Sequence, residues 1–159
     1  MASNDIDRAW ELMKTISICM LTTRDGEEIR SRPMGAFVRR DEGVIYFLTD
    51  ARRHKDEEIA ANPQVCLAFA NADDQNYVAV TGRARVSNDR AKIKELWSIP
   101  AKAWWDSPDD PNVRLLTVTP QDAEFWDSPG SFVSYVQMAA AAVTGTRPEL
   151  GENKKVRMG

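Results

Sequence analysis

The chain has 159 residues, of which 43% are hydrophobic and 28% are charged, and its formal net charge is -3. This composition is typical of one soluble globular domain with a single buried core. Basic residues are scattered except at positions 52–55 and near the C-terminus. We therefore do not expect the broad basic face that duplex nucleic acid requires.

Several classes of function are excluded by what the sequence lacks. No apolar run approaches the roughly 20 residues that span a bilayer, and the first residues lack the basic start and apolar centre of a secretion signal. We therefore expect a cytoplasmic protein without a membrane partner. A single histidine rules out zinc sites of the Cys/His type, and the common nucleotide-binding and hydrolase strings do not occur.

The two cysteines, Cys19 and Cys66, each lie within an apolar run, in the strings SICML and VCLAF. Free cysteine is among the residues most often buried. We expect two reduced, buried thiols rather than a disulfide, a metal site or a nucleophile.

The first part of the chain is predicted to contain a helix and three paired strands. Residues 4–15 repeat apolar side chains at the spacing of an amphipathic helix. Three runs rich in β-branched and aromatic residues follow, separated by turns at RDGEE and RRDEG: residues 16–23, 29–38 and 44–49. Gly and Asp between such runs are typical of hairpins, so an antiparallel meander is expected.

A helix and two strands are predicted next. The helix covers residues 51–61 and ends before Pro63, because the residue that precedes proline is pushed out of the helical region. Residues 64–70 and 76–87 are predicted strands, the second with period-two alternation and a bulge at Gly82.

The last part of the chain begins with a helix over residues 88–97, capped by Asn88 or Asp89. A structured loop rich in proline and tryptophan follows it. The remaining predicted elements are strand residues 113–120 and 122–127 on either side of a corner at Pro120, a helix over 131–145 and a polar tail over 146–159. The tail is expected to be mobile unless a partner chain holds it.

These elements predict a mainly β fold. Six antiparallel strands, with helices inserted after the third and fifth, close most economically into a small barrel because closure removes unpaired edges. We expect one barrel domain over residues 1–145 with peripheral helices.

A cluster of cations, Arg52 to Lys55, stands at the start of the helix predicted over residues 51–61, where the positive end of the helix dipole disfavours it. A bound phosphate would reverse that cost, since free backbone N–H groups together with Lys55 and one or both of Arg53 and His54 suit a dianion. The alternative is a solvated face on which Arg53 pairs with Glu57 and His54 pairs with Glu58.

A second indication of a ligand is the string RSRPM at residues 30–34. Arg30 and Arg32 share one face of the predicted strand, and Pro33 removes a backbone donor that a central strand would need. An edge or bulge at Pro33 would leave the backbone free for a flat ligand, with Arg32 directed towards its phosphate. The alternative is an edge strand protected against aggregation by Arg and Pro.

Taken in order, these segments resemble the flavin-binding split-barrel superfamily of pyridoxamine 5'-phosphate oxidase, and more closely its general stress protein branch. The resemblance covers about residues 5–145. Its carriers are the strings MLTTRDG, RSRPM, IYFLTD, ANPQVCLAF, YVAVTGRARV, DRAKIKELW and EFWDSPGS.

The resemblance implies a six-stranded antiparallel split β-barrel that forms a homodimer with FMN at the subunit interface. The strand at Arg32, Pro33 and Met34 would run along the flavin ring, with the arginine helping to hold the phosphate. The residues that would complete the site are Leu48 and Thr49 at the ring edge, His54 and Lys55 at the phosphate, Tyr77 where the oxidase has a glutamine, and Trp126 from the second subunit.

The sequence also departs from the vitamin-phosphate oxidase. Phe37 stands near the position of its lysine, and no basic residue follows Trp126 before Arg147, where the oxidase has an Arg-x-His motif. Pyridoxamine phosphate is therefore not the expected substrate. The resemblance supports a cofactor, FMN or alternatively FAD, without fixing a reaction.

Three functions remain open at this point. The first is an FMN-dependent oxidoreductase of the general stress protein type with an unknown small substrate, and the second is a flavin carrier without turnover. The third is a stress-linked interaction protein that uses the Trp104-Trp105 loop, although aromatic residues are also enriched where subunits meet. Tyr77, Asp50 and His54 could exchange protons, but none has a tuning partner nearby in sequence, so no catalytic residue is assigned.

Overall fold

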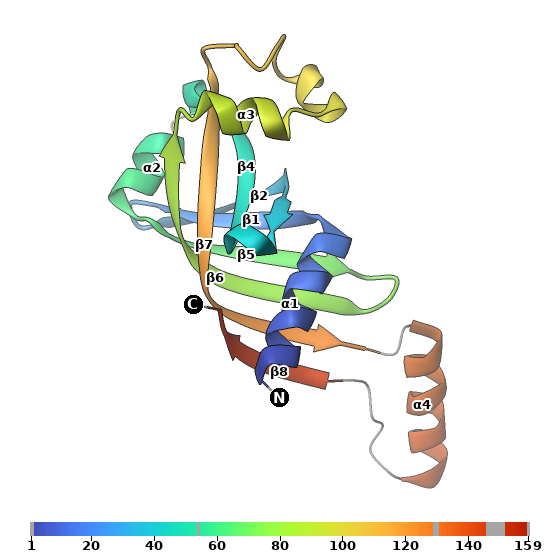
Figure 1. Cartoon of the computed structure of the whole chain (residues 1–159). Coiled ribbons are helices and arrows are strands. Elements are labelled where there is room, and N and C mark those ends of the chain that lie inside the picture. The colour runs from blue at the N-terminus through green and yellow to red at the C-terminus, as the bar shows by residue number, and fades with distance from the viewer. Residues whose placement is uncertain (1, 54, 129–130, 146–151, 159) are drawn as a thin grey trace.

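The computed structural model describes residues 2–53, 55–128, 131–145 and 152–158 (Figure 1). Within these residues eight strands form one antiparallel sheet in the order β2-β1-β5-β6-β7-β4-β3, and β8 pairs with β7 outside this path. The strands are β1 (Ile18–Asp25), β2 (Glu28–Gly35), β3 (Phe37–Arg39), β4 (Val44–Asp50), β5 (Gln64–Asn71), β6 (Asn76–Ser87), β7 (Val113–Asp127) and β8 (Glu152–Arg157).

Four α-helices and three short 3-10 turns connect the described strands. They are α1 (Ala2–Ile16), α2 (Lys55–Ala61), α3 (Arg90–Leu96), α4 (Ser131–Thr144), η1 (Arg40–Glu42), η2 (Ala51–Arg53) and η3 (Ile99–Ala103). All four predicted helices are present. The Asp89 side chain caps α3 by accepting a hydrogen bond from the Lys92 backbone N–H at 3.1 Å. None of the described helices is long and apolar enough to span a bilayer.

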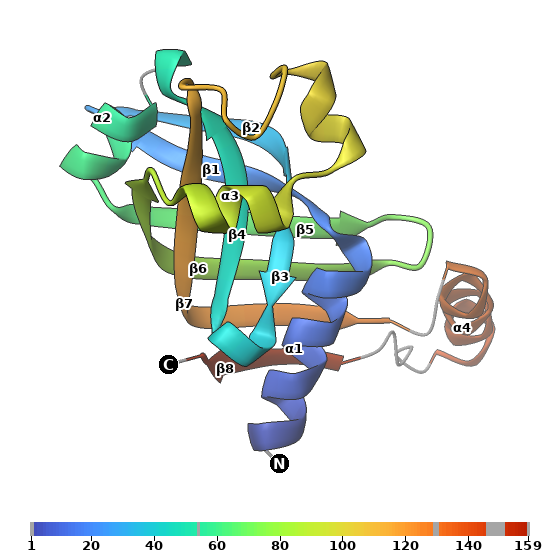
Figure 2. The ribbon, with the colours of Figure 1, turned by 45° about the horizontal axis from the view of Figure 1, so that its top comes forward.

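The sheet curls because the strands at its two ends, β2 and β3, follow each other in the chain and are separated only by Ala36. The run predicted over 29–38 divides at Ala36, so β2 pairs with β1 whereas β3 pairs with β4. The Ala36 N–H donates to the Ser17 carbonyl at 2.7 Å and holds this crossing in place. Figure 2 shows β3 and β4 turning away from β1, β2 and β5 beyond this point. The strand is interrupted at Ala36 rather than at Pro33. Pro33 lies within β2, which is an edge strand, and an edge strand tolerates a proline because it pairs on one side only.

Strand β7 connects the two halves of the barrel. Its first half pairs with β4, and its second half pairs with β8 along the same edge. Between the two halves Thr81 pairs with Asp122 and Gly82 pairs with Pro120, so Gln121 is an extra residue in β7. The register is thus irregular at Gly82, where a bulge was predicted, but the extra residue lies in β7, and the expected corner at Pro120 lies within this one strand.

The strand count differs from the six expected. The split at Ala36 adds one strand, and β8 adds another from the tail that was expected to be mobile. β8 forms because the second half of β7 has an unpaired edge, since the pairing of β7 with β4 extends no further than Val118 of β7. The polar residues of the tail use their backbone groups on that edge, which requires no apolar side chains.

Two groups of buried residues lie on either side of β4. Helix α1 packs Ala9, Trp10, Leu12 and Met13 against the interior of the barrel, and the guanidinium of Arg8 binds the Asp127 carboxylate at 2.6 and 2.9 Å. On the other side, Ile93 and Leu96 of α3, with Ala101 and Trp105 near η3, pack on Tyr46, Val113 and Leu115. This second layer places the segment around η3 beside the open edge of the barrel (Figure 2).

Candidate functional site

A cavity of about 670 Å³ lies where the barrel is split. Its walls come from β2, from the end of β4 with η2, from α2 and from the segment 98–105 around η3. The topology accounts for its position, since β2 and β4 belong to opposite ends of the sheet path and are not paired with each other. The volume is within the range of about 300 to 1,000 Å³ that small-molecule sites occupy.

Five of the predicted cofactor-binding residues line this cavity together: Arg32, Pro33, Met34, Leu48 and Thr49. They come from β2 and β4, which are distant in the sheet order and meet only across the cavity. Thr49 is buried, whereas Leu48 is partly exposed. Their contact with a flavin stays a prediction.

The predicted phosphate residues of the helix start are only partly described. His54 lies outside the described residues. Lys55 begins α2, but its side chain is not among those the structure describes, so its role stays a prediction. Arg53 is described: it lines the cavity and its guanidinium lies 5.9 Å from the ring centroid of Trp104. That distance allows a cation–π contact.

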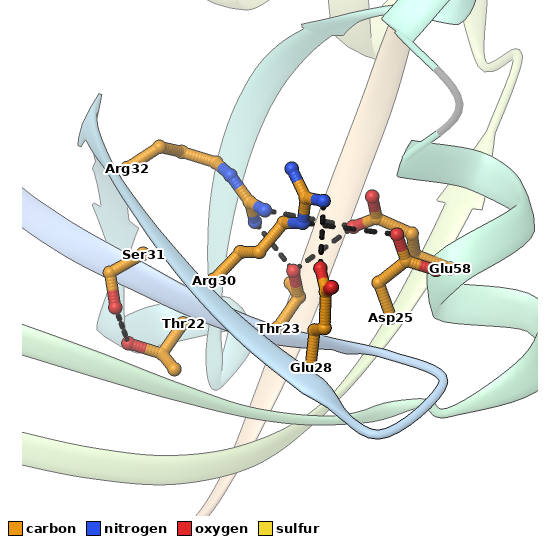
Figure 3. A network of polar contacts seen from close by, with 8 residues as sticks. All are labelled: Thr22, Thr23, Asp25, Glu28, Arg30, Ser31, Arg32 and Glu58. Carbon is orange, nitrogen blue, oxygen red and sulfur yellow. Dashed lines mark hydrogen bonds and ion pairs between the residues drawn. The ribbon is translucent and has the colours of Figure 1, made fainter.

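Side chains from three elements meet in one polar network beside the cavity (Figure 3). Arg32 of β2 donates from Nη1 to the Thr23 hydroxyl of β1 at 2.7 Å, and that hydroxyl donates to Glu58 Oε2 of α2 at 3.1 Å. Arg32 Nη2 lies 3.6 Å from the same carboxylate oxygen. Glu58 therefore faces the barrel, and the expectation that it lies on a solvated face is wrong. Its pairing with His54 lies outside the described residues, and the pairing of Arg53 with Glu57 stays a prediction.

Asp50 forms a second charged group in the cavity wall. Arg52 donates to its carboxylate from Nε at 2.9 Å and from Nη2 at 2.7 Å, and the Arg52 backbone N–H donates at 2.9 Å. These contacts hold the pKa of Asp50 at about 2, against a smaller opposing effect of burial. The carboxylate is therefore ionised at neutral pH and cannot act as a proton donor.

The far wall of the cavity is aromatic. Trp104 and Trp105 follow η3 directly, and both line the cavity together with Ala101. Trp105 is buried, and among the described residues its indole N–H has no partner at hydrogen-bond distance, whereas Trp104 is exposed. From the sequence, this pair was considered for a role in protein interaction or at a subunit interface. In the structure both residues line the cavity.

Tyr77 and Trp126, the remaining predicted residues, do not line the cavity of their own chain. They pair with each other across β6 and β7, and both are partly exposed. Their assignment to a flavin therefore depends on a second subunit and stays a prediction.

Residues 4–149 match the family described as pyridoxamine 5'-phosphate oxidase like. The chain belongs to this family. General stress protein 26 of Bacillus subtilis (strain 168) is 36% identical over 86 residues, which cover 50% of this chain and 59% of that protein. The match thus spans less than two thirds of the Bacillus protein. Protein bli-3 of Neurospora crassa is 24% identical over 148 residues, covering 86% of this chain and 71% of that protein.

Solved structures of the pyridoxamine 5'-phosphate oxidase-like family share the fold. A Jannaschia sp. CCS1 structure described as a general stress protein 26 matches with a TM-score of 0.81 at 27% identity and covers 99% of both chains. The general stress FMN/FAD binding protein of Xanthomonas citri matches with a TM-score of 0.70 at 25% identity, covering 81% of this chain and 92% of that chain. The predicted relationship to general stress proteins and the split-barrel fold are both confirmed.

Sequence reasoning missed the inward orientation of Glu58 and the cavity wall formed by Trp104 and Trp105. The acidic run that begins at Asp56 gives no signal for which carboxylate faces the barrel. A weak signal in the sequence is the apolar residue Ile59 next to Glu58. In the structure Ile59 is buried, so this side of α2 packs against the sheet.

Proposed function

We propose that this chain binds a flavin in the cavity at the barrel split and acts as a flavin-dependent oxidoreductase on a small molecule. The observation that carries the proposal is the pairing of chemistries within one cavity. Arg30, Arg32 and Arg53 supply positive charge, while Met34, Phe37 and other apolar side chains line the remaining surface. A flavin nucleotide combines a flat, largely apolar ring with a phosphate, so the described residues fit such a ligand.

The family resemblance assigns roles within this cavity. Pro33, Met34 and Leu48 would lie along the ring, and Arg32 would bind the phosphate together with Lys55 and His54. FMN is the proposed ligand, and the Xanthomonas relative described as an FMN/FAD binding protein supports either flavin. A bound flavin would supply electron or hydride transfer, while the chain would bind and orient the reactants.

The proposal includes a homodimer that completes each site. The sheet face opposite α1 carries the exposed apolar side chains of Ile18 and Met20 on β1, Tyr77 on β6 and Trp126 on β7, with β5 between β1 and β6. A second copy covering this face would remove them from water, and Trp126 would then reach the flavin of the partner subunit. The two free cysteines support a reducing, cytoplasmic location.

The substrate is proposed to be a small molecule other than pyridoxamine phosphate. The stretch from Asp127 to Thr146 contains no basic residue that could bind a second phosphate after Trp126. Asp50 is kept ionised by Arg52, so proton transfer to a substrate would have to come from solvent or another group.

A second candidate is a flavin carrier without turnover. The observation that favours it is the absence of a poised proton donor among the described cavity residues, since Asp50 is bound to Arg52. An enzyme should be reduced by NADH or NADPH at an appreciable rate under anaerobic conditions, whereas a carrier should keep its flavin oxidised. Stopped-flow measurement of the loss of the yellow absorption band separates the two.

Titration of the purified protein with FMN tests the binding proposal. Quenching of flavin fluorescence should show saturable binding, and Lys55→Ala should weaken it by about 1.5 to 3 kcal/mol, as expected for a hydrogen bond to a charged group. Lys94→Ala is the control, because Lys94 is an exposed lysine of α3 that pairs with Asp109 away from the cavity. If the protein binds no flavin, the proposal is wrong.

A further inference from the structure

The contact between Arg32 and Glu58 joins two elements that border the cavity. Arg32 comes from β2 and Glu58 from α2, and the hydroxyl of Thr23 on β1 bridges them (Figure 3). The side chains of Arg32 and Glu58 are 24% and 15% exposed, and Thr23 is 2% exposed. Burying the Glu58 carboxylate to this degree costs free energy unless a cation pairs with it. The Arg32 guanidinium is therefore held next to Glu58.

Arg30 provides a comparison within the same strand. It also lines the cavity, but its partners are Glu28 at 2.8 Å and Asp25 at 3.8 Å, both in its own hairpin. The Arg30 side chain is 57% exposed. Such a surface pair holds a side chain weakly and links no separate elements. The two arginines therefore differ in how firmly they are fixed, although they lie on the same face of β2.

The fixed guanidinium keeps donors available for a ligand. Arginine has five N–H donors; Arg32 uses one of them, on Nη1, for the hydrogen bond to Thr23, and its Nη2 faces Glu58 at ion-pair distance. The Nε–H of Arg32 makes no hydrogen bond to any of the described residues. An arginine held by a carboxylate behind it can bind a phosphate in front without first losing side-chain entropy.

The geometry points to Glu58 and Thr23 as positioning residues that hold Arg32 in place for the phosphate of the bound ligand. This inference rests on the proposed flavin binding. Glu58 acts through Arg32 and makes no contact with the ligand itself. It also ties α2, the helix that begins at Lys55, to β1 and β2, so the two proposed phosphate-binding segments keep a fixed relative position.

Binding of FMN and of riboflavin, which lacks the phosphate, tests this role. Arg32→Ala should weaken FMN binding by about 10- to 100-fold, the loss of one charge-assisted contact. Glu58→Ala should weaken it by about 5- to 20-fold, because a guanidinium without its partner binds less well. Riboflavin affinity should change by less than about twofold in both variants, since the phosphate contact is absent. In the double variant Glu58→Ala should add nothing to the loss caused by Arg32→Ala.

Conservative substitutions and a matched control sharpen the test. Glu58→Gln keeps an oxygen that accepts the Thr23 hydrogen bond and should stay within about threefold of the wild type. Thr23→Val removes only the bridging hydroxyl and should weaken FMN but not riboflavin, which preserves the test where Glu58→Ala does not fold. Glu27→Ala removes an exposed carboxylate from the turn between β1 and β2, outside the cavity, and should leave both affinities unchanged.

Four results would overturn the inference. FMN affinity could be unchanged or tighter in Glu58→Ala, and tighter binding would make Glu58 a competitor of the phosphate. The losses of FMN affinity caused by Arg32→Ala and Glu58→Ala could be additive in the double variant, or riboflavin binding could weaken as much as FMN binding. Either result would show that Glu58 does not act through Arg32 on the phosphate. In all these cases flavin binding itself still stands. Failure of the wild type to bind either FMN or riboflavin would instead refute the proposed function and this inference together.

Discussion

Tyr77 of β6 and Trp126 of β7 are directly opposite each other in the sheet, with 37% and 38% of their surfaces exposed. The strand register places Ala70 of β5 beside Tyr77 and Ile18 of β1 in the same row. Alternation along these strands directs their neighbours, such as Val78 and Phe125, into the core. The sheet therefore presents a second apolar face that no described helix covers (Figures 1 and 2).

Trp126→Ala should weaken the proposed homodimer. Truncation of a large aromatic residue near the centre of an interface typically costs about 2 kcal/mol or more, so the dimer dissociation constant should rise at least about 30-fold. Sedimentation equilibrium measures it. Lys94→Ala is the control, since it removes an exposed side chain of α3 that pairs with Asp109, away from this face and from the cavity. A wild type that stays monomeric at all concentrations would contradict the proposed assembly.

Gly82→Ala should destabilise the fold through the β7 bulge. An added Cβ would lie 2.7 Å from the Thr119 carbonyl oxygen and 2.9 Å from Val118 Cγ1, and the backbone of a central strand cannot easily move away. We expect the free energy of unfolding to fall by about 2 to 3 kcal/mol in urea, with an unchanged m-value. Gly35→Ala is the matched control, because apart from its chain neighbours no described residue has an atom within 4 Å of the added Cβ. Equal stability of the two variants would show that the bulge relaxes freely.

The two thiols should differ in their reactivity towards Ellman's reagent. Burial raises the pKa of Cys19 to about 12 and also raises the pKa of Cys66, so neither forms the reactive thiolate readily at pH 8. Cys19 faces the core and should react only after unfolding. Cys66 lies on the outer sheet face between Thr22 and Thr81 and should react slowly, more slowly still as dimer forms. Cys66→Ser should leave one thiol that is unreactive in the native protein, and rapid native labelling of that thiol would contradict the assignment.

Much of the fold could be predicted because its signals are local. The alternation of Val78 and Val80 with exposed neighbours fixed the phase of β6, and Asp89 marked the start of α3. The cluster of Arg32, Pro33 and Met34 with Leu48 and Thr49 could be predicted only through the family resemblance, since these residues meet across the open edges of a curled sheet.

The features that sequence missed depend on long-range pairing. Residues 152–157 have little apolar alternation, and they form β8 because the second half of β7 has a free edge. Glu58 was equally suited to a solvated face, and its inward orientation depends on Arg32 and Thr23 being present on neighbouring strands. Neither partner can be identified from the helix that carries Glu58.

Arg52→Ala should reduce stability in a pH-dependent way through Asp50. The contacts with Arg52 lower the pKa of Asp50 from an ordinary value of 3.8 to about 2, so the unfolded chain binds more protons than the folded chain between these two values. The stabilisation is therefore complete above pH 3.8 and is lost as the pH falls towards 2. Because the Arg52 side chain is 62% exposed, we expect at most about 1 kcal/mol at pH 6.

Urea unfolding of the wild type and Arg52→Ala at pH 6, 5, 4 and 3 measures this difference, which should shrink at the lowest pH. The Arg52 backbone N–H still donates to Asp50 in the variant, so the pKa should return only part of the way to its ordinary value. In an Asp50→Asn background Arg52→Ala should have no pH-dependent effect, since the titrating group is gone. A stability difference that stays constant from pH 6 to pH 3 would show that Arg52 acts by packing rather than by its charge on Asp50.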